Sequence, residues 1–276
     1  ALVRLRDQAE TIGLIDEIRT YNDSDLDEGY RLLFGDLAER NPKGFGLWSW
    51  KPYLVLREAK SMREGDILFY LDAGVEINPL GSVRFCAYLD HIAREEFLFF
   101  STGLQNRFWS KNKPELVDRI NFFRNHVGAT VFGLRVSKDS LALLEDWLEL
   151  AAIKSGALLE DVVEGEATLP GFMDHRHDQS ALSAVVYKHQ IKGVIPDETW
   201  FKPWRRGREM PFLAMRNKTG KSYLPIELAH PAISLLRRTF RLLLNSGHRR
   251  LVLADLFRSH TSKIRNTQAQ NPHSRE

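Results

Sequence analysis

The sequence predicts an α/β fold in which helices flank a mixed, mostly parallel sheet. Apolar runs of strand length alternate with helix-like segments along the chain, as they do in α/β domains. The run at 67–71 is continuously apolar and is bounded by turn residues, which indicates a strand buried on both faces, as in parallel sheets. With 276 residues, 43% of them hydrophobic, the chain can bury a substantial core.

Hydrophobic periodicity and cap residues predict the individual elements. The chain opens on an amphipathic pattern at 2–12 with no strand before it, so the first strand of a doubly wound sheet is missing and we expect a processed or partial chain. Pro52 and Pro114 suit the first turns of helices, and Ser137 suits an N-cap. Further helices are expected at 26–40, 52–62, 80–93, 138–154 and 181–187, and strands at 14–21, 67–71, 96–100 and 130–135.

Composition excludes several classes of protein. Cys86 is the only cysteine, so no disulfide framework can form within the chain, and no zinc-binding spacing of Cys and His occurs. No apolar run approaches the roughly 20 residues that span a bilayer, and the N-terminus lacks a secretory pattern. We therefore expect a cytoplasmic protein, soluble or peripheral on the inner face of the membrane. The net charge of +3 does not by itself indicate a nucleic-acid partner.

Asp72 is the first candidate site residue. It directly follows the apolar run at 67–71, and ligands of open α/β sheets bind outside the carboxyl ends of the strands. Ala73 and Gly74 come next and leave room for a bulky group to approach the backbone. The alternative is a strand-ending aspartate that only caps the following turn.

A second candidate segment lies at 44–53 and reads G-F-G-L-W-S-W-K-P-Y. Trp48 and Trp50 could stack on a sugar or a base, and Lys51 could pair with a phosphate. The alternative is that both tryptophans belong to the hydrophobic core.

A third candidate segment, 174–179, reads D-H-R-H-D-Q and stands just before the apolar run of a helix. It offers donors to an anion and ligands to a metal, although His175 and His177 lack the spacing and the third ligand of a zinc site. The alternative is a polar capping segment in which Asp178 accepts hydrogen bonds from backbone N–H groups.

Three blocks, at 44–53, 65–74 (G-D-I-L-F-Y-L-D-A-G) and 175–180 (H-R-H-D-Q-S), occur in this order. Together they resemble bacterial nucleotide-sugar glycosyltransferases of the GT-A fold, of the kind found in capsule and lipopolysaccharide gene sets. The resemblance extends over about 2–195. It implies a GT-A, Rossmann-like catalytic domain at 1–212 that moves a sugar from a nucleotide-diphosphate donor to a glycan or lipid-linked acceptor.

The resemblance also implies roles for individual residues. Asp72 matches the first aspartate of the D-x-D motif that holds Mg²⁺ or Mn²⁺ on the donor diphosphate, whereas Gly74 replaces the second. Metal dependence is therefore open, with Glu76 as an alternative ligand. Asp178 resembles the later acidic residue that acts as general base or stabilises the transition state. The expected donor-binding residues are Trp48, Trp50, Lys51, Asp72, Ala73, Gly74, Lys111, Arg176, His177 and Gln179.

The last third of the chain is rich in Lys and Arg. Amphipathic patterns at 233–244 and 248–264 predict two basic helices within a C-terminal region at 213–264, and 265–276 is predicted to be disordered. Such helices either lie on an anionic membrane surface, which would suit a lipid-linked acceptor, or pack against the catalytic domain.

Three other functions use part of the same sequence. A nucleic-acid-binding protein would use the basic C-terminal region but would not need Asp72 or the His-Asp-Gln segment, so no nucleic-acid partner is expected. A hydrolase of nucleotide sugars or phosphate esters would share the donor site and lack an acceptor groove. A non-catalytic member of the family would explain Gly74 and the missing first strand.

Overall fold

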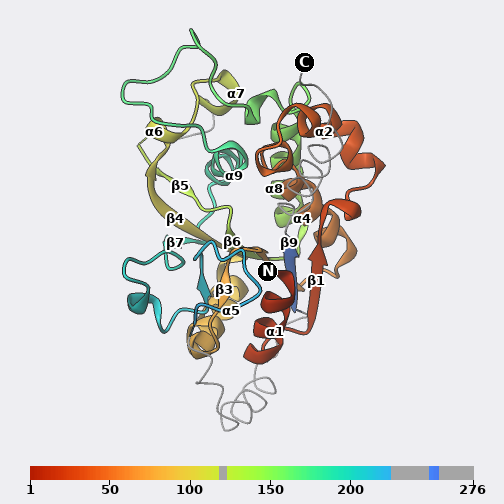
Figure 1. Ribbon diagram of the computed structural model, residues 1–276, viewed down its shortest axis with the longest axis vertical. Helices are drawn as coiled ribbons and strands as arrows, with labels where there is room; N and C mark the ends of the chain where they lie inside the picture. Colours follow the sequence, from red (N-terminus) through yellow and green to blue (C-terminus); the bar gives the residue numbers. More distant parts are fainter. Residues whose placement is uncertain (118–122, 225–248, 255–276) are drawn as a thin grey trace, which may run out of the picture.

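The computed structural model describes residues 1–117, 123–224 and 249–254, and these residues form an α/β unit around a mixed sheet of seven strands (Figure 1). The strand order is β1-β9-β2-β6-β4-β5, with β7 also paired to β4. A separate two-stranded sheet joins β3 to β8. The strands are β1 Glu17–Tyr21, β2 Ile67–Asp72, β3 Glu76–Ile77, β4 Phe97–Gln105, β5 Asn125–Val127, β6 Val131–Arg135, β7 Val194–Pro196, β8 Phe212–Leu213 and β9 Arg249–Ala254.

Helices cover both faces of the sheet (Figure 1). The first and fifth helices pack on one face, and the second, fourth, eighth and ninth on the other. The helices are α1 Leu2–Ile12, α2 Glu28–Arg40, α3 Gly44–Leu47, α4 Trp50–Ser61, α5 Ser82–Glu95, α6 Asn106–Trp109, α7 Pro114–Val117, α8 Lys138–Ala152 and α9 His177–Lys188. Short 3₁₀ segments lie at Asp23–Asp25, Pro79–Gly81, Ala157–Leu159 and Trp204–Gly207.

β2 shows why its sequence is continuously apolar. Successive side chains of a strand point to opposite faces, so Leu68 and Tyr70 enter the core under α4, α8 and α9. Phe69 and Leu71 enter the core under α1 and α5. The predicted strand buried on both faces is thereby confirmed, and it ends at Asp72.

The predicted helix boundaries agree closely with the structure. Ser137 caps α8, since its Oγ accepts a hydrogen bond of 3.1 Å from the backbone N–H of Ser140. Pro52 lies in the first turn of α4, and Pro114 begins α7. The short helix α6 was not among the predicted elements.

The sheet is mixed, as expected, and its antiparallel pairs involve β6 and β5. β1, β9 and β2 run parallel, and β7 is parallel to β4, but β6 is antiparallel to both β2 and β4, and β5 is antiparallel to β4. β6 fills the space between β2 and β4, which α5 connects along the chain. A buried strand is apolar whichever way its neighbour runs, so the sequence pattern does not fix the direction of β6.

The C-terminal region contains a central strand in place of part of a predicted helix. Residues 249–254, predicted as the start of a basic helix, form β9 between β1 and β2 (Figure 1). Leu251 and Val252 are fully buried there, and this burial outweighs local helix propensity. Arg249 pairs with Asp16 at 3.3 Å, and Arg250 pairs with Glu17 at 2.8 Å.

The other predicted features of this region, 225–248 and 255–276, lie outside the described residues. Among the helices that the structure does describe, none has the length and apolar character needed to cross a bilayer. Residues 213–224 continue the α/β unit beyond the boundary expected at 212. β8 pairs with β3, and the backbone N–H of Asn217 donates to the carbonyl of Gly74 at 2.8 Å.

Candidate functional site

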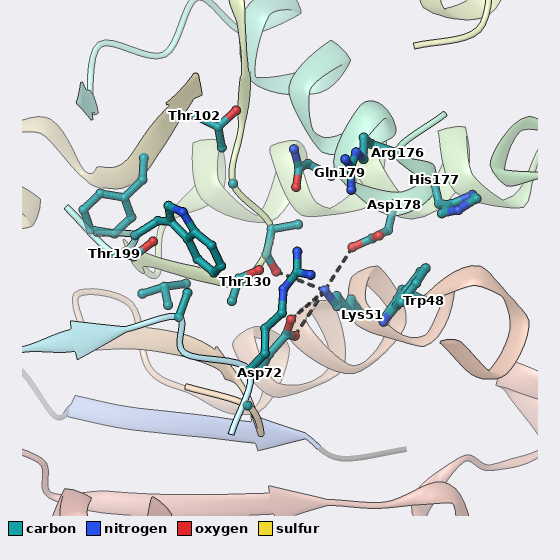
Figure 2. A pocket seen from close by; sticks show the side chains of 18 of the residues that line it. Trp48, Lys51, Asp72, Thr102, Thr130, Arg176, His177, Asp178, Gln179 and Thr199 are labelled. Atoms are coloured by element: carbon teal, nitrogen blue, oxygen red, sulfur yellow. Dashed lines mark hydrogen bonds and ion pairs between the residues drawn. The ribbon is translucent and has the colours of Figure 1, made fainter. Parts of the chain in front are cut away.

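A cavity of about 760 Å³ opens at the end of β2 where Asp72 lies. Its walls come from the start of α4, the end of β2, the start of β6, the first turn of α9 and the segment around residues 197–218. Figure 2 shows Asp72 and Asp178 on two sides of Lys51, with Trp48, Arg176, His177 and Gln179 around them. The structure therefore gathers all three sequence blocks at one place.

Lys51 is the centre of this site. Its Nζ lies 3.1 Å from Asp72 Oδ1, 3.2 Å from Asp178 Oδ2 and 3.2 Å from the carbonyl oxygen of Ala129. The side chains of Lys51 and Asp178 are 4% and 6% exposed, whereas that of Asp72 is 27% exposed to the cavity. The Tyr70 hydroxyl donates to Asp72 Oδ1 at 2.6 Å and fixes that carboxylate further.

An unusual backbone segment delivers Lys51 to the cavity. Residues 44–48 all have positive φ, between 51° and 80°, although three of them are not glycine. Each such non-glycine residue costs of order 1 kcal/mol, and strain of this kind gathers at functional sites. Gly44 is needed here because a Cβ would lie 2.5 Å from the Trp48 ring. The turn brings Trp48 against His177, with ring centroids 5.5 Å apart.

Asp178 lies within the first turn of α9 and is not its N-cap. The N-cap is Arg176, which makes no side-chain cap hydrogen bond, and the Asp178 carboxylate faces Lys51 instead. Burial raises the pKa of Asp178 to about 6, with Asp72 adding to the rise and Lys51 opposing it. A carboxyl group with this pKa is a base at neutral pH that can hold a proton transiently.

Lys51 stays charged in spite of its burial. Burial alone would lower its pKa, but the carboxylates of Asp178 and Asp72 outweigh it, and the net effect is a raised pKa. With both carboxylates ionised, the cluster carries one net negative charge. Lys51 makes four close contacts to oxygen atoms, so its three N–H groups are committed to the protein, and the expectation that it binds a phosphate is not supported.

The two histidines hold a loop in place. His175 Nε2 donates to the carbonyl of Leu158 at 3.0 Å, and its Nδ1 accepts from the backbone N–H of Lys111 at 3.2 Å. His177 Nδ1 donates to the carbonyl of Leu159 at 2.7 Å. Burial is the main cause that lowers the pKa of both rings, so both are neutral at pH 7. His177 also lines the cavity, where its ring stacks on that of Trp48.

Two predicted donor-binding residues are already engaged elsewhere. The Lys111 side chain is buried away from the cavity, and its Nζ donates to the carbonyls of Ala157 and Glu160 at 2.7 and 3.0 Å. Lys111 is therefore not part of the site, contrary to the expectation that it binds the donor. Trp50 borders the cavity but is 1% exposed, and its indole N–H donates to the Gly44 carbonyl at 2.9 Å, so its ring offers little surface for stacking.

Glu76 was expected as an alternative metal ligand, but it lies in the core and does not line the cavity. It forms an ion pair of 3.2 Å with Arg4, whose own guanidinium donates to the carbonyls of Ala73 and Val75. The groups that donate hydrogen bonds to the Glu76 carboxylate are the side chains of Gln8, Asn217 and Ser222 and the backbone N–H of Tyr223. Glu76 thus fastens the segment after β8 to β3.

Replacing Glu76 with glutamine is expected to lower the free energy of unfolding by about 1–3 kcal/mol. The amide keeps the size of the side chain but turns an N–H group toward existing donors and removes the charge that faces Arg4. Denaturant unfolding measures the change. A loss of bound metal from the variant without a loss of stability would contradict this structural role.

A divalent cation does not fit the donor set around Asp72. Within the described residues, no three His, Cys, Asp or Glu side chains gather as a metal site. The two carboxylates that face each other across the site, Asp72 and Asp178, already share the ammonium of Lys51. A second cation would have to sit beside the first, where like charges repel.

The structure adds cationic residues that the sequence reasoning missed. Arg216 and Lys218 line the cavity, as does Arg176. Arg176 lies over the Trp109 ring at 4.2 Å and Arg216 near the Trp200 ring at 5.5 Å, and neither forms an ion pair with a described residue. Gly74 makes room for this wall, since a Cβ there would lie 3.1 Å from the Cα of Arg216. In the sequence, the basic residues within 216–221 could have indicated this cationic wall.

Comparison of the chain with protein-family models, with curated proteins and with solved structures gives no match. The geometry and chemistry of the site therefore have to indicate what the protein does.

Proposed function

We propose that this protein is a glycosyltransferase that moves a sugar from a nucleotide-diphosphate donor to a hydroxyl of a glycan or lipid-linked acceptor. The observation that carries the proposal is the Asp72–Lys51–Asp178 cluster on the wall of the cavity, at the carboxyl end of a buried strand. The likeness of the three sequence blocks to GT-A enzymes supports the same reaction.

Asp178 is the base of this proposed reaction. Its carboxylate takes the proton from the acceptor hydroxyl while the acceptor oxygen bonds to the anomeric carbon. The bond from that carbon to the diphosphate breaks, and the nucleoside diphosphate leaves with the electron pair. The net negative charge of the cluster stabilises positive charge that develops at the anomeric carbon.

The leaving diphosphate needs cations that are not already neutralised. Arg176 and Arg216 meet this requirement better than Lys51, because neither has a carboxylate partner among the described residues. Each guanidinium is supported by an indole ring and presents several N–H donors to phosphate oxygens. These two arginines are therefore assigned to the diphosphate in the proposed mechanism.

Arg216→Ala is expected to weaken binding of a nucleoside diphosphate about tenfold or more, since a charge-assisted hydrogen bond contributes about 1.5–3 kcal/mol. Arg208→Ala is the matched control, because Arg208 is 77% exposed and lies outside the cavity wall. Titration calorimetry measures both affinities. Equal affinities in the two variants would remove Arg216 from the site.

Turnover is expected to rise with pH through about 6 and to level off above it. Asp178 must be deprotonated to accept a proton, and its pKa is raised to about 6, so turnover falls about tenfold per pH unit below that value. A pH profile of kcat/KM, which reports the groups of the free enzyme, measures this limb. A flat profile between pH 5 and 7 would show that Asp178 is not the base.

A panel of nucleotide sugars tests the proposed function directly. A ligand that binds only the folded state raises the melting temperature, so the panel identifies the donor without an assay for the acceptor. Products are then analysed with and without glycan acceptors. Sugar release at equal rates in both conditions would indicate hydrolysis with water as the acceptor, and the absence of any nucleotide-sugar response would refute the proposal.

A further inference from the structure

The surroundings of the Lys51 ammonium resemble the oxygen shell of a bound cation. Nζ lies 3.1 and 3.3 Å from the two carboxylate oxygens of Asp72, 3.2 Å from Asp178 Oδ2 and 3.2 Å from the Ala129 carbonyl. Hard divalent cations take the same kind of ligands, carboxylate and carbonyl oxygens. In this protein, a side chain places a positive charge at the centre of the shell.

The chain holds this charge in a fixed position. Lys51 is in the first turn of α4, and the rings of Trp50 and Tyr70 lie 5.8 and 5.7 Å from Nζ. The two carboxylates keep the ammonium protonated at neutral pH, since they raise its pKa against the effect of burial. Unlike a metal ion, this cation cannot dissociate.

We propose that the Lys51 ammonium takes the place of a divalent metal ion between Asp72 and Asp178, so that the site neither requires nor binds one. A metal ion at Asp72 would have to displace an ammonium that is covalently tethered. The proposal does not depend on glycosyl transfer, because it concerns the occupancy of an oxygen shell and is read out by metal binding alone.

Removal of the lysine side chain should convert the shell into a metal site. Lys51→Ala leaves two carboxylates and a carbonyl oxygen around an empty volume, and water can complete the coordination. Carboxylates must move inward, since calcium, for example, binds oxygen at about 2.3–2.6 Å. Lys51→Met is the matched control, because it removes the same charge but still fills the volume with an apolar side chain that offers no oxygen ligand.

The test measures binding of Mn²⁺ alone to the full chain, by electron paramagnetic resonance and by thermal melting. Lys51→Ala is expected to bind Mn²⁺ at least tenfold more tightly than either the wild type or Lys51→Met. Its melting temperature should rise by roughly 5–10 °C at a metal concentration about a hundred times Kd. The double variant Lys51→Ala/Asp72→Asn should lose this response.

Two outcomes would overturn the proposal. One is tight binding of Mn²⁺ to the wild type that Asp72→Asn abolishes, because it would show a metal beside the ammonium. The other is a folded Lys51→Ala protein that binds Mn²⁺ no better than Lys51→Met. If Lys51→Ala does not fold, the wild-type titration and its Asp72→Asn counterpart decide the question.

Discussion

Asp178→Asn is expected to lower turnover about a hundredfold or more, while the protein remains folded and donor affinity changes little. Asparagine keeps the size of the side chain but removes nearly all of its basicity, and general-base catalysis contributes about 10²- to 10⁴-fold. A hundredfold loss corresponds to about 2.7 kcal/mol in the barrier. Stability should change by no more than about 1 kcal/mol, since Lys51 keeps its contacts to Asp72 and to the Ala129 carbonyl.

Asp146→Asn is the control for this experiment. Asp146 lies on α8 and pairs with Lys188 and His189 at the opposite end of α9, outside the cavity. The same substitution there should leave kcat unchanged. Near-normal turnover in a well-folded Asp178→Asn protein would contradict the assignment of the base, and Asp174, which also lines the cavity, would be the next candidate.

Lys51→Met is expected to lower the free energy of unfolding by about 3–5 kcal/mol, because it leaves two facing carboxylates without their counter-ion. Lys60→Met is the matched control on the same helix. Lys60 pairs with Glu145 at 2.7 Å but is 53% exposed, so its loss should cost no more than about 1 kcal/mol. Denaturant unfolding of both variants at pH 7 gives the comparison.

The pH dependence of this loss identifies its cause. Lys51 lowers the pKa of Asp178 in the wild type, so its removal raises that pKa further above the unfolded value. A carboxyl group whose pKa is higher in the folded state binds more protons there, so Lys51→Met should regain stability as pH falls toward 5. Adding Asp178→Asn should also recover part of the loss. A loss that is equal at pH 5 and pH 7 would point to packing instead of charge.

Part of the site was accessible from sequence because its signals are local. A strand buried on both faces must be apolar throughout, so the end of β2 and the position of Asp72 follow from periodicity alone. Pro52 and Ser137 marked helix starts because capping and first-turn preferences concern neighbouring residues. Asp178 was identified as a candidate because it lies in a polar segment that resembles a glycosyltransferase sequence block. Its contact with Lys51 could not be predicted from the sequence.

The sequence by itself determined the α/β class, most helix boundaries and the strand that ends at Asp72. Tertiary structure decided the role of each charge. Lys51 forms an ion pair with Asp178, which is 127 positions further along the chain. Glu76 is buried by residues that come both before and after it in the sequence. β9 enters the sheet because it pairs with β1 and β2, and because Leu251 and Val252 are buried in the cores on the two faces. Strand pairing and side-chain burial depend on which distant segments come into contact, and the local sequence pattern does not indicate those segments.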